Sequence, residues 1–282
     1  MWALIGGSGF ENFSDVEILE ELPTATPFGA CSSGFKRIRI HENELLFLPR
    51  HGHAHELIPS SVNYRANIFI LKKYGAKAII STSSVGSLDA TLKPGEVVIP
   101  NQFIDRTKGI RAHTFCDNGI ASHVSLAEPV SPELVNLVKD ISSSIEFNIH
   151  FDKTYLCIEG PAFSTRAESL LYVNLGAAII GMTAFPEYAL AREAGLSYLS
   201  CCFVTDYDSW DPSITHVTIQ EVKNILAKNN LKAFELISNI IITPLNLLEL
   251  SAGNLSLQKS LIVPYYNLTK DQESWLSIIT QE

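Results

Sequence analysis

Two carboxylates two residues apart, Asp206 and Asp208, directly follow an apolar segment of the chain. Residues 196–204 have no helical period and follow Gly195, which predicts a buried strand. A strand buried on both faces belongs to an α/β sheet, and such sheets bind ligands at the carboxyl ends of their strands. These two carboxyl groups are therefore candidates for chemistry on a bound ligand. An Asp-rich turn exposed to solvent is the alternative interpretation.

A glycine-rich segment follows the short strand expected at residues 2–5. It reads Gly6-Gly7-Ser8-Gly9. The glycines permit positive φ and close backbone approach, while Ser8 offers an N–H and a hydroxyl to an anion. The segment completes neither a dinucleotide-binding pattern nor a Walker A loop. An ordinary tight turn remains open as an alternative.

Further donors suited to an anion follow two other expected strands. Residues 37–48 read as a hairpin that leads to Arg50 and His51. Arg50 offers a planar fork of donors to an oxyanion, and His51 adds another donor. A buried strand at residues 78–82 opens into Ser83 and Ser84, which add hydroxyl groups. Because several strands end in such residues, a shared anion site is favoured over unrelated turns.

The histidines at positions 51, 53 and 55 raise the possibility of a metal site. Their spacing matches no usual metal-binding motif, and no second set of carboxylates lies nearby in the sequence. We therefore expect no metal. A zinc site and a solvated loop remain the two alternative interpretations of this histidine cluster.

Composition sets limits on the class of protein. Of the 282 residues, 46% are apolar, which provides a large core, and the net charge of −9 disfavours nonspecific binding to nucleic acid or anionic lipid. The five cysteines form no disulfide framework, and no signal peptide or membrane-spanning run is visible. These features predict a soluble, cytoplasmic protein.

Strands and helices are expected to alternate along the chain. We expect a main domain at residues 1–245 and a C-terminal extension of unknown role at 246–282. Ser164 is a candidate cap for the helix that follows it. The remaining expected strands are 96–104, 148–158 and 178–180, and the expected helices are 63–74, 132–142, 164–175, 186–194 and 219–242.

Taken together, these segments resemble the trimeric purine nucleoside phosphorylase family, and most closely its 5′-methylthioadenosine phosphorylase branch. The resemblance extends from residue 1 to about residue 240, with the matching segments in the family's order. They include Gly6-Gly7-Ser8-Gly9, Pro49-Arg50-His51-Gly52, Glu159-Gly160-Pro161, Gly181-Met182-Thr183, Pro186-Glu187 and Thr205-Asp206-Tyr207-Asp208.

The resemblance implies an α/β fold of three layers, with a central mixed, twisted sheet flanked by helices, and a homotrimer. It assigns phosphate binding to Ser8, Arg50, His51, Ser83, Ser84 and Thr183. It assigns nucleoside binding to Phe163, Ser164, Met182, Ile219, Val222 and His123, with His123 reaching a neighbouring subunit. Asp206 and Asp208 are the implied catalytic residues.

The resemblance also implies a pentosyltransferase that uses inorganic phosphate as co-substrate and needs no cofactor. Phosphorolysis develops positive charge on the sugar, which an anionic phosphate stabilises, and the leaving purine must gain a proton at N7. Asp206 is the expected proton donor. We expect phosphorolysis of 5′-methylthioadenosine to adenine and 5-methylthioribose 1-phosphate, in purine and methionine salvage.

Other functions remain open at this point. The site could favour 6-oxopurine nucleosides or 5′-methylthioinosine, and Ala162 stands where an arginine is frequent in the methylthioadenosine branch. A nucleoside-binding protein without catalysis and a metal-dependent hydrolase are the alternatives from other classes. Asp206 and Ser164 favour a 6-aminopurine, because the oxopurine branch carries asparagine and glutamate at these positions.

Overall fold

The computed structural model describes residues 1–6, 15–117, 119–212, 219–262 and 268–281, the side chains of 219–223 excepted. Its centre is a nine-stranded mixed sheet in the order β10-β9-β8-β11-β7-β1-β6-β5-β2. A separate two-stranded sheet pairs β3 (Ala25–Thr26) with β4 (Gly29–Ala30). The nine strands are β1 (Trp2–Gly6), β2 (Val16–Glu21), β5 (Lys36–Ile40), β6 (Asn43–Pro49), β7 (Ala78–Ser87), β8 (Val97–Arg106), β9 (Ile149–Ile158), β10 (Ile179–Gly181) and β11 (Ser197–Tyr207).

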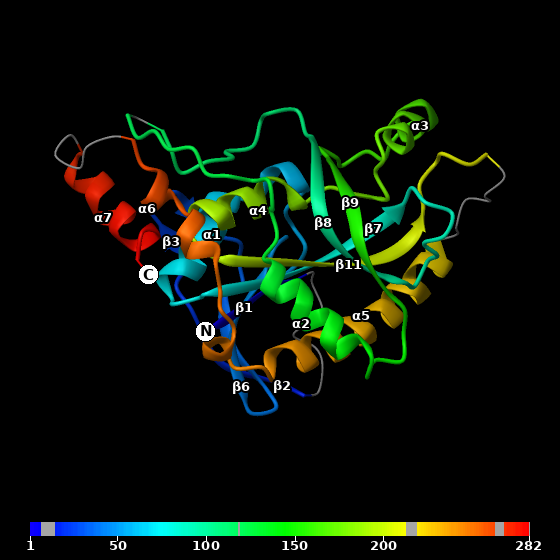
Figure 1. Ribbon diagram of the computed structural model, residues 1–282, viewed down its shortest axis with the longest axis horizontal. Helices are drawn as coiled ribbons and strands as arrows, with labels where there is room; N and C mark the ends of the chain where they lie inside the picture. The colour runs from blue at the N-terminus through cyan, green and yellow to red at the C-terminus, as the bar shows by residue number, and fades with distance from the viewer. Residues whose placement is uncertain (7–14, 118, 213–218, 263–267, 282) are drawn as a thin grey trace.

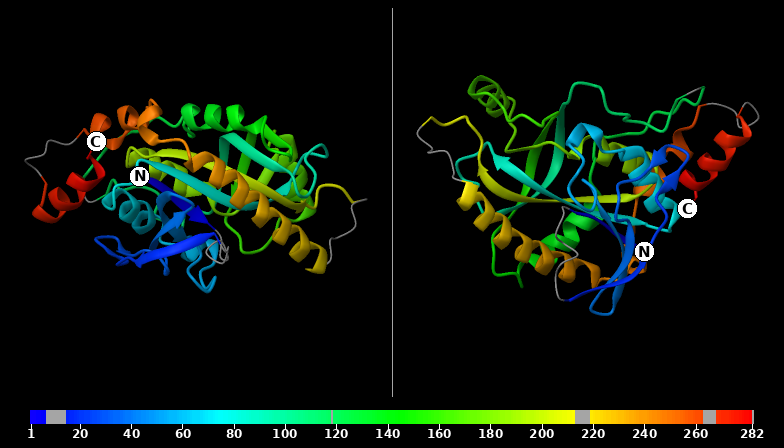
Figure 2. Two further views of the ribbon diagram at one scale, coloured as in Figure 1. Left: turned by 90° about the horizontal axis from the view of Figure 1, so that it is seen from below. Right: turned by 180° about the vertical axis from the view of Figure 1, so that it is seen from behind.

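Helices cover both faces of the central strands, which confirms the predicted α/β class with a mixed sheet (Figures 1 and 2). α1 (Tyr64–Lys73) and α4 (Ala184–Glu193) pack together on one side. α2 (Pro132–Ser142) and α5 (Ile219–Ile241) lie on the other. The remaining helices are α3 (Arg166–Asn174), α6 (Leu257–Ser260), α7 (Lys270–Ile279) and the short 3₁₀ turns η2 (Pro59–Ser61), η3 (Leu245–Leu247) and η4 (Ala252–Leu255).

The sheet closes on itself at one end. β10 pairs in parallel with β9 and in an antiparallel manner with β7, so that β7, β11, β8, β9 and β10 form a closed circuit. The strands β1, β6 and β7 run parallel to one another, as do β7 and β11. Their carboxyl ends therefore lie on the same side of the sheet, which is where such folds bind ligands.

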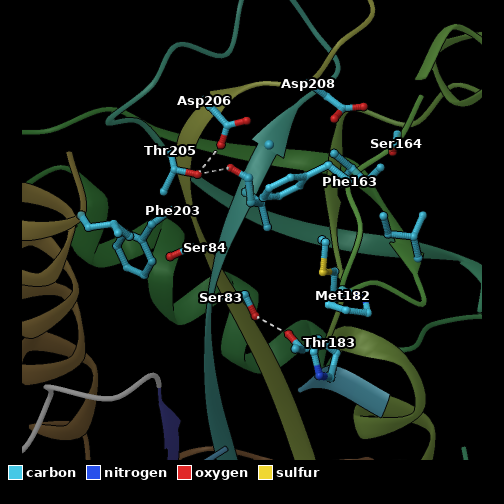
Figure 3. A pocket seen from close by; sticks show the side chains of 18 of the residues that line it. Ser83, Ser84, Phe163, Ser164, Met182, Thr183, Phe203, Thr205, Asp206 and Asp208 are labelled. Atoms are coloured by element: carbon cyan, nitrogen blue, oxygen red, sulfur yellow. Dashed lines mark hydrogen bonds between the residues drawn. The ribbon is translucent and has the colours of Figure 1, made fainter. Parts of the chain in front are cut away.

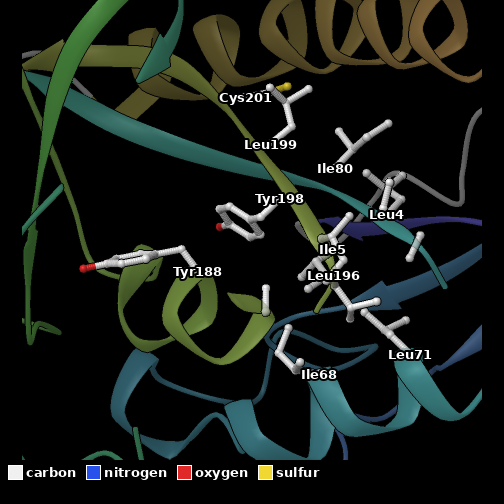
Figure 4. Close-up of a cluster of buried hydrophobic side chains, with 14 of the residues drawn as sticks. Leu4, Ile5, Ile68, Leu71, Ile80, Tyr188, Leu196, Tyr198, Leu199 and Cys201 are labelled. Atoms are coloured by element: carbon white, nitrogen blue, oxygen red, sulfur yellow. The ribbon is translucent and has the colours of Figure 1, made fainter. Parts of the chain in front are cut away.

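The apolar segments of the sequence form the interior strands of the sheet and make up its core. Ile5 in β1, Ile80 in β7 and Leu199 in β11 are fully buried, and α1 adds Ile68 and Leu71 from below (Figure 4). β11 is buried at every position from 197 to 205, as expected of a strand covered by helices on both faces.

Two local predictions differ from the structure. The strand that was expected to end at residue 204 continues to Tyr207, because residues 206 and 207 still pair with β7. Asp206 therefore lies in a strand, and the Asp-rich turn is wrong for it. The cap of α3 is Thr165, whose hydroxyl accepts from the Glu168 N–H, and not Ser164.

The C-terminal segment packs into the main core. Helix α7 begins with a capping box formed by Thr269 and Gln272. It buries Trp275, and the Trp275 ring lies edge-on to Phe28 at 5.2 Å between centroids. The division of the chain at residue 245 stays a prediction. No helix within the described ranges is long and apolar enough to cross a membrane.

Candidate active site

A cavity of about 1160 Å³ opens at the carboxyl ends of β7 and β11. It also takes wall residues from β9, β10, the loop after β6 and one face of α5. The structure brings ten of the predicted site residues to this one cavity (Figure 3). They are Arg50, His51, Ser83, Ser84, Phe163, Ser164, Met182, Thr183, Asp206 and Asp208.

One end of the cavity gathers hydroxyl groups and a guanidinium. The Oγ of Ser83 in β7 lies 3.2 Å from the Oγ1 of Thr183, the residue that precedes α4. Arg50 and His51 follow β6 and line the same cavity. We call this group, together with Ser84, the phosphate end.

Arg50 is held by a buried carboxylate. Its Nε and Nη2 donate to the two carboxylate oxygens of Glu187 at 2.7 and 3.0 Å, its Nη1 donates to the Thr82 carbonyl, and Nη2 also donates to Ser81. Burial alone would lower the pKa of Arg50, but the charge and hydrogen bonds of Glu187 raise it above its usual value. Tyr198 also donates to Glu187.

This pairing changes the predicted role of Arg50. Four of its five N–H groups already have acceptors among the described residues, namely Glu187, Ser81 and the Thr82 carbonyl. One Nη1 hydrogen remains for a ligand. The Arg50–Glu187 pair is net neutral, and phosphate binding by Arg50, Ser83 and Thr183 stays a prediction.

The hydrogen-bonding state of His51 differs from the prediction that its ring donates to an anion. Its Nδ1 lies 2.8 Å from the Leu57 carbonyl, and a carbonyl can only accept, so Nδ1 carries the hydrogen. Burial and the neighbouring Arg50 lower the pKa of His51 to about 4. The neutral ring therefore offers Nε2 as an acceptor, and a donor there requires a proton from elsewhere.

At the other end of the cavity, which we call the base end, lie the half-buried carboxyl group of Asp206 and the buried carboxyl group of Asp208. Burial raises the pKa of Asp206, the nearby Asp208 adds to this, and a hydrogen bond from Thr205 opposes it. Burial also raises the pKa of Asp208. Asp208 Oδ2 and Ser164 Oγ are buried and make no hydrogen bond of full geometry among the described residues, although the hydroxyls of Ser164 and Ser169 lie close enough to Asp208 to lower its pKa. Unpaired polar atoms in a cavity wall indicate a ligand with complementary groups.

Met182 is positioned by residues that the sequence reading did not assign to the site. Arg111 is buried, donates to the Met182 carbonyl at 2.9 Å and pairs with Glu159 at 2.7 Å. Gly160 has φ of +67°, and a Cβ there would lie 2.4 Å from the Met182 sulfur. The glycine of the Glu159-Gly160-Pro161 segment thus makes room for Met182, which only the three-dimensional arrangement reveals.

Four predicted residues are not placed at this cavity. Ser8 lies outside the described residues, and so do the side chains of Ile219 and Val222, although both belong to α5. His123 is exposed and is not among the residues that line the cavity. Its predicted role at a neighbouring subunit's site stays a prediction.

The three histidines after β6 do not gather as metal ligands. The rings of His51 and His55 stack at 4.6 Å between centroids, and His53 is exposed. Within the described ranges, no group of three or more His, Cys, Asp or Glu side chains could hold a metal ion. All five cysteines are free.

The mixed α/β fold thus contains a cavity with hydroxyl groups and an arginine at one end and two carboxyl groups at the other. Residues 2–242 match the phosphorylase superfamily, and the chain belongs to it. The S-methyl-5′-thioadenosine phosphorylase of Geobacter sulfurreducens is 43% identical over 238 residues, which are 84% of this chain and 83% of that protein.

Two solved structures extend the similarity over nearly the whole chain. A methylthioadenosine phosphorylase from an antarctic soil metagenomic library superposes with a TM-score of 0.91 and 37% identity, covering 99% of this chain and 98% of the other. A variant of the adenosine/methylthioadenosine phosphorylase of Schistosoma mansoni in complex with methylthioadenosine has a TM-score of 0.83 and 31% identity, covering 92% and 97%.

Proposed function

We propose that this protein catalyses phosphorolysis of 5′-methylthioadenosine to adenine and 5-methylthioribose 1-phosphate. The observation that carries the proposal is one cavity that has the hydroxyls of Ser83 and Thr183 with Arg50 and His51 at one end and two carboxyl groups of raised pKa at the other. The names of the relatives described above support the same substrate.

At the phosphate end, the nucleophile is inorganic phosphate. Hydroxyls of Ser83 and Thr183 and the remaining Nη1 hydrogen of Arg50 donate to its oxygens. Nε2 of neutral His51 accepts the hydrogen that phosphate itself carries. Held there, the anion attacks C1′ and stabilises the positive charge that develops on the sugar.

At the base end, the leaving purine gains electron density and needs a proton at N7. Asp206 supplies it, because its raised pKa keeps a proton on the carboxyl group closer to neutral pH. Asp208 Oδ2 accepts from the 6-amino group and completes the hydrogen bonding that this buried oxygen lacks. Phe163 packs against the base, and Met182 lies under the ribose.

We also propose that the active form is a homotrimer in which His123 and the apolar pair Ile219 and Val222 complete the 5′ pocket. The large exposure of Phe163, 81%, supports a neighbouring subunit near the base end. Leu170 and Leu171 on α3 are also exposed apolar side chains. The proposal includes the cytoplasmic location predicted from the free thiols.

Sharing of sites between subunits has a direct test. Subunits with His123→Ala and subunits with Asp206→Ala should each be inactive alone. A mixed trimer places one intact site at a mixed interface and should regain part of the activity. Mixed trimers that are verified by mass and stay inactive would argue against sharing.

The function itself is tested with four nucleosides: methylthioadenosine, adenosine, inosine and methylthioinosine, each with phosphate present and omitted. We expect free adenine from methylthioadenosine only when phosphate is present, together with 5-methylthioribose 1-phosphate in equal amount. Base release without phosphate would indicate a hydrolase. Binding of the nucleosides with no turnover would indicate a binding protein.

A further inference from the structure

A single residue interrupts the pairing of β11 with β7 next to the proposed acid. Val204 lies opposite Val85 and Asp206 lies opposite Gly86, so Thr205 has no partner of its own and is the extra residue of a β-bulge. In a regular strand, neighbouring side chains point to opposite faces. At this bulge both Thr205 and Asp206 line the cavity.

The Thr205 hydroxyl has one hydrogen and two acceptors within reach. Its Oγ1 lies 2.6 Å from Asp206 Oδ1, a bond drawn in Figure 3, and 3.2 Å from the Val85 carbonyl. Thr205 is 7% exposed, so solvent competes little for this hydrogen. A hydroxyl donor at 2.5 to 2.7 Å is typical of a bond to a carboxylate. The short distance therefore assigns the hydrogen to Asp206.

The two oxygens of the Asp206 carboxyl group consequently differ. Oδ1 is occupied as an acceptor by Thr205. Oδ2 faces Gly86, and a Cβ at that glycine would lie 3.6 Å from Oδ2. Among the described residues, no side chain donates a hydrogen bond to Oδ2. A proton on Oδ2 keeps the 2.6 Å bond that Thr205 donates, whereas a proton on Oδ1 would reverse it and leave Thr205 to donate over the longer 3.2 Å to the Val85 carbonyl.

We propose that Thr205 is a positioning residue that donates to Asp206 Oδ1 and thereby fixes the catalytic proton on Oδ2. This inference rests on the proposed function, in which Asp206 protonates N7 of the leaving purine. In this step a phosphate oxygen forms a bond to C1′, the glycosidic bond breaks and leaves its electron pair on the purine, and the hydrogen moves from Asp206 Oδ2 to N7. Thr205 keeps donating to the carboxylate that results.

Besides burial, the charge of Asp208 raises the pKa of Asp206, and other groups that can carry charge line the same cavity. Within the described part of the wall, these groups are Tyr207 at the end of β11, Asp208 and Asp211 after it, Arg166 at the start of α3, and Arg50, His51 and His55 after β6. None of these is altered by changes at Thr205, so their contribution stays constant across the variants compared below.

The test compares Thr205→Val, which keeps the shape and removes the hydroxyl, with Thr205→Ser, which keeps the hydroxyl. The carboxyl group of Asp206 is titrated by ¹³C NMR in the ligand-free trimer and assigned with Asp206→Asn. Thr205→Val removes the hydrogen-bond donor that stabilises the ionised Asp206 carboxylate, so the pKa of Asp206 should rise by about one unit. Thr205→Ser should keep the wild-type titration.

Turnover of methylthioadenosine gives the second measurement. In Thr205→Val, kcat should fall about tenfold, with KM for nucleoside and phosphate changed less than about threefold, because the proton donor is affected and binding is not. Thr205→Ser should stay within about twofold of the wild type. Thr205→Ala, which only removes atoms, serves as the second hydroxyl-free variant if Thr205→Val does not fold.

Wild-type titration and kcat in a folded hydroxyl-free variant would overturn the proposal. Equal loss in Thr205→Ser and Thr205→Val would also overturn it, since shape and not the hydroxyl would then matter. If the wild type releases no base with phosphate, the proposed function fails. The carboxyl titration would still decide whether Thr205 donates to Asp206, so the two failures can be told apart.

Discussion

The two ends of the cavity are built in opposite ways. At the phosphate end, the one strong cation is already paired, because Arg50 forms a two-point bond with Glu187 and both side chains are at most 2% exposed. At the base end, Asp208 Oδ2 and Ser164 Oγ are buried without a hydrogen bond of full geometry among the described residues. Most donors of Arg50 are therefore used before a ligand binds, whereas the base end keeps a carboxyl and a hydroxyl group available to a ligand.

This difference shows how each end can recognise its substrate. The paired Arg50 side chain is already held in one orientation, so little conformational entropy is lost when phosphate binds. Its positive charge, however, is largely cancelled by Glu187. Unpaired polar atoms reject a base that lacks the matching groups, because the mismatch leaves them buried and unsatisfied. We therefore expect the phosphate end to hold phosphate in position. The base end should select the base and supply the acid catalyst.

Removing the acid should have the largest effect on activity. Asp206→Asn keeps the shape of the side chain but cannot release a proton to N7. We expect kcat for methylthioadenosine to fall by about 10² to 10⁴, with KM for phosphate nearly unchanged. Steady-state kinetics with each substrate varied in turn measures both. A large rise in KM for phosphate instead would mean that the two ends are not independent.

Breaking the pair at the phosphate end should act first on stability. Glu187→Gln leaves the Arg50 charge buried without its counter-ion, and we expect the free energy of unfolding to fall by about 3 kcal/mol. Glu17→Gln, which breaks an exposed ion pair with Arg39, is the matched control and should change it by less than about 1 kcal/mol. Urea unfolding monitored by circular dichroism compares the two. Equal changes would contradict a buried, pre-paired arginine.

The specificity of the base end should depend on Asp208. A carboxylate accepts from a 6-amino group, whereas an amide can also donate to a 6-oxo group. Asp208→Asn should therefore reduce the preference for methylthioadenosine over methylthioinosine by about tenfold, from the cost of one unpaired buried group. The ratio of kcat/KM for the two nucleosides measures this. An unchanged ratio would place recognition of position 6 elsewhere.

The smallest expected effect is the contribution of His51 to the pH dependence of the free energy of unfolding. Its pKa is about 4 in the folded protein and close to 6.5 in an unfolded chain. Between these values the unfolded chain binds a proton that the folded protein does not. Stability should therefore rise with pH from 4 to 6.5, by about 1 kcal/mol from this residue. His51→Gln should flatten that rise, while His53→Gln at an exposed position should leave it unchanged. Unfolding free energies between pH 4 and 7 decide this.

Much of the frame could be predicted from local patterns. The buried strands at β7 and β11 follow from apolar segments without a helical period, and the ends of those strands carry the polar residues that the cavity gathers. Strand ends in a parallel arrangement meet at one edge. That geometric rule is why Ser83 and Asp206, distant in the sequence, could be expected in one site.

Pairings between distant residues could not be predicted in this way. Glu187 is 137 residues from Arg50, and no spacing rule links them, so the arginine was interpreted as a free anion-binding fork. The bulge at Thr205 depends on the register of β11 against β7, which the segment itself does not encode. The hydrogen on His51 Nδ1 depends on where the Leu57 carbonyl lies.

The most direct test of the account uses a substrate that needs no acid. Methylthioadenosine methylated at N7 carries a positive charge on the base, which can leave without gaining a proton. If Asp206 acts only as the proton donor, Asp206→Asn should be slowed by about 10² to 10⁴ on methylthioadenosine and by less than about tenfold on the N7-methylated compound. An equal loss on both substrates would contradict acid catalysis by Asp206 and with it the contrast between the two ends.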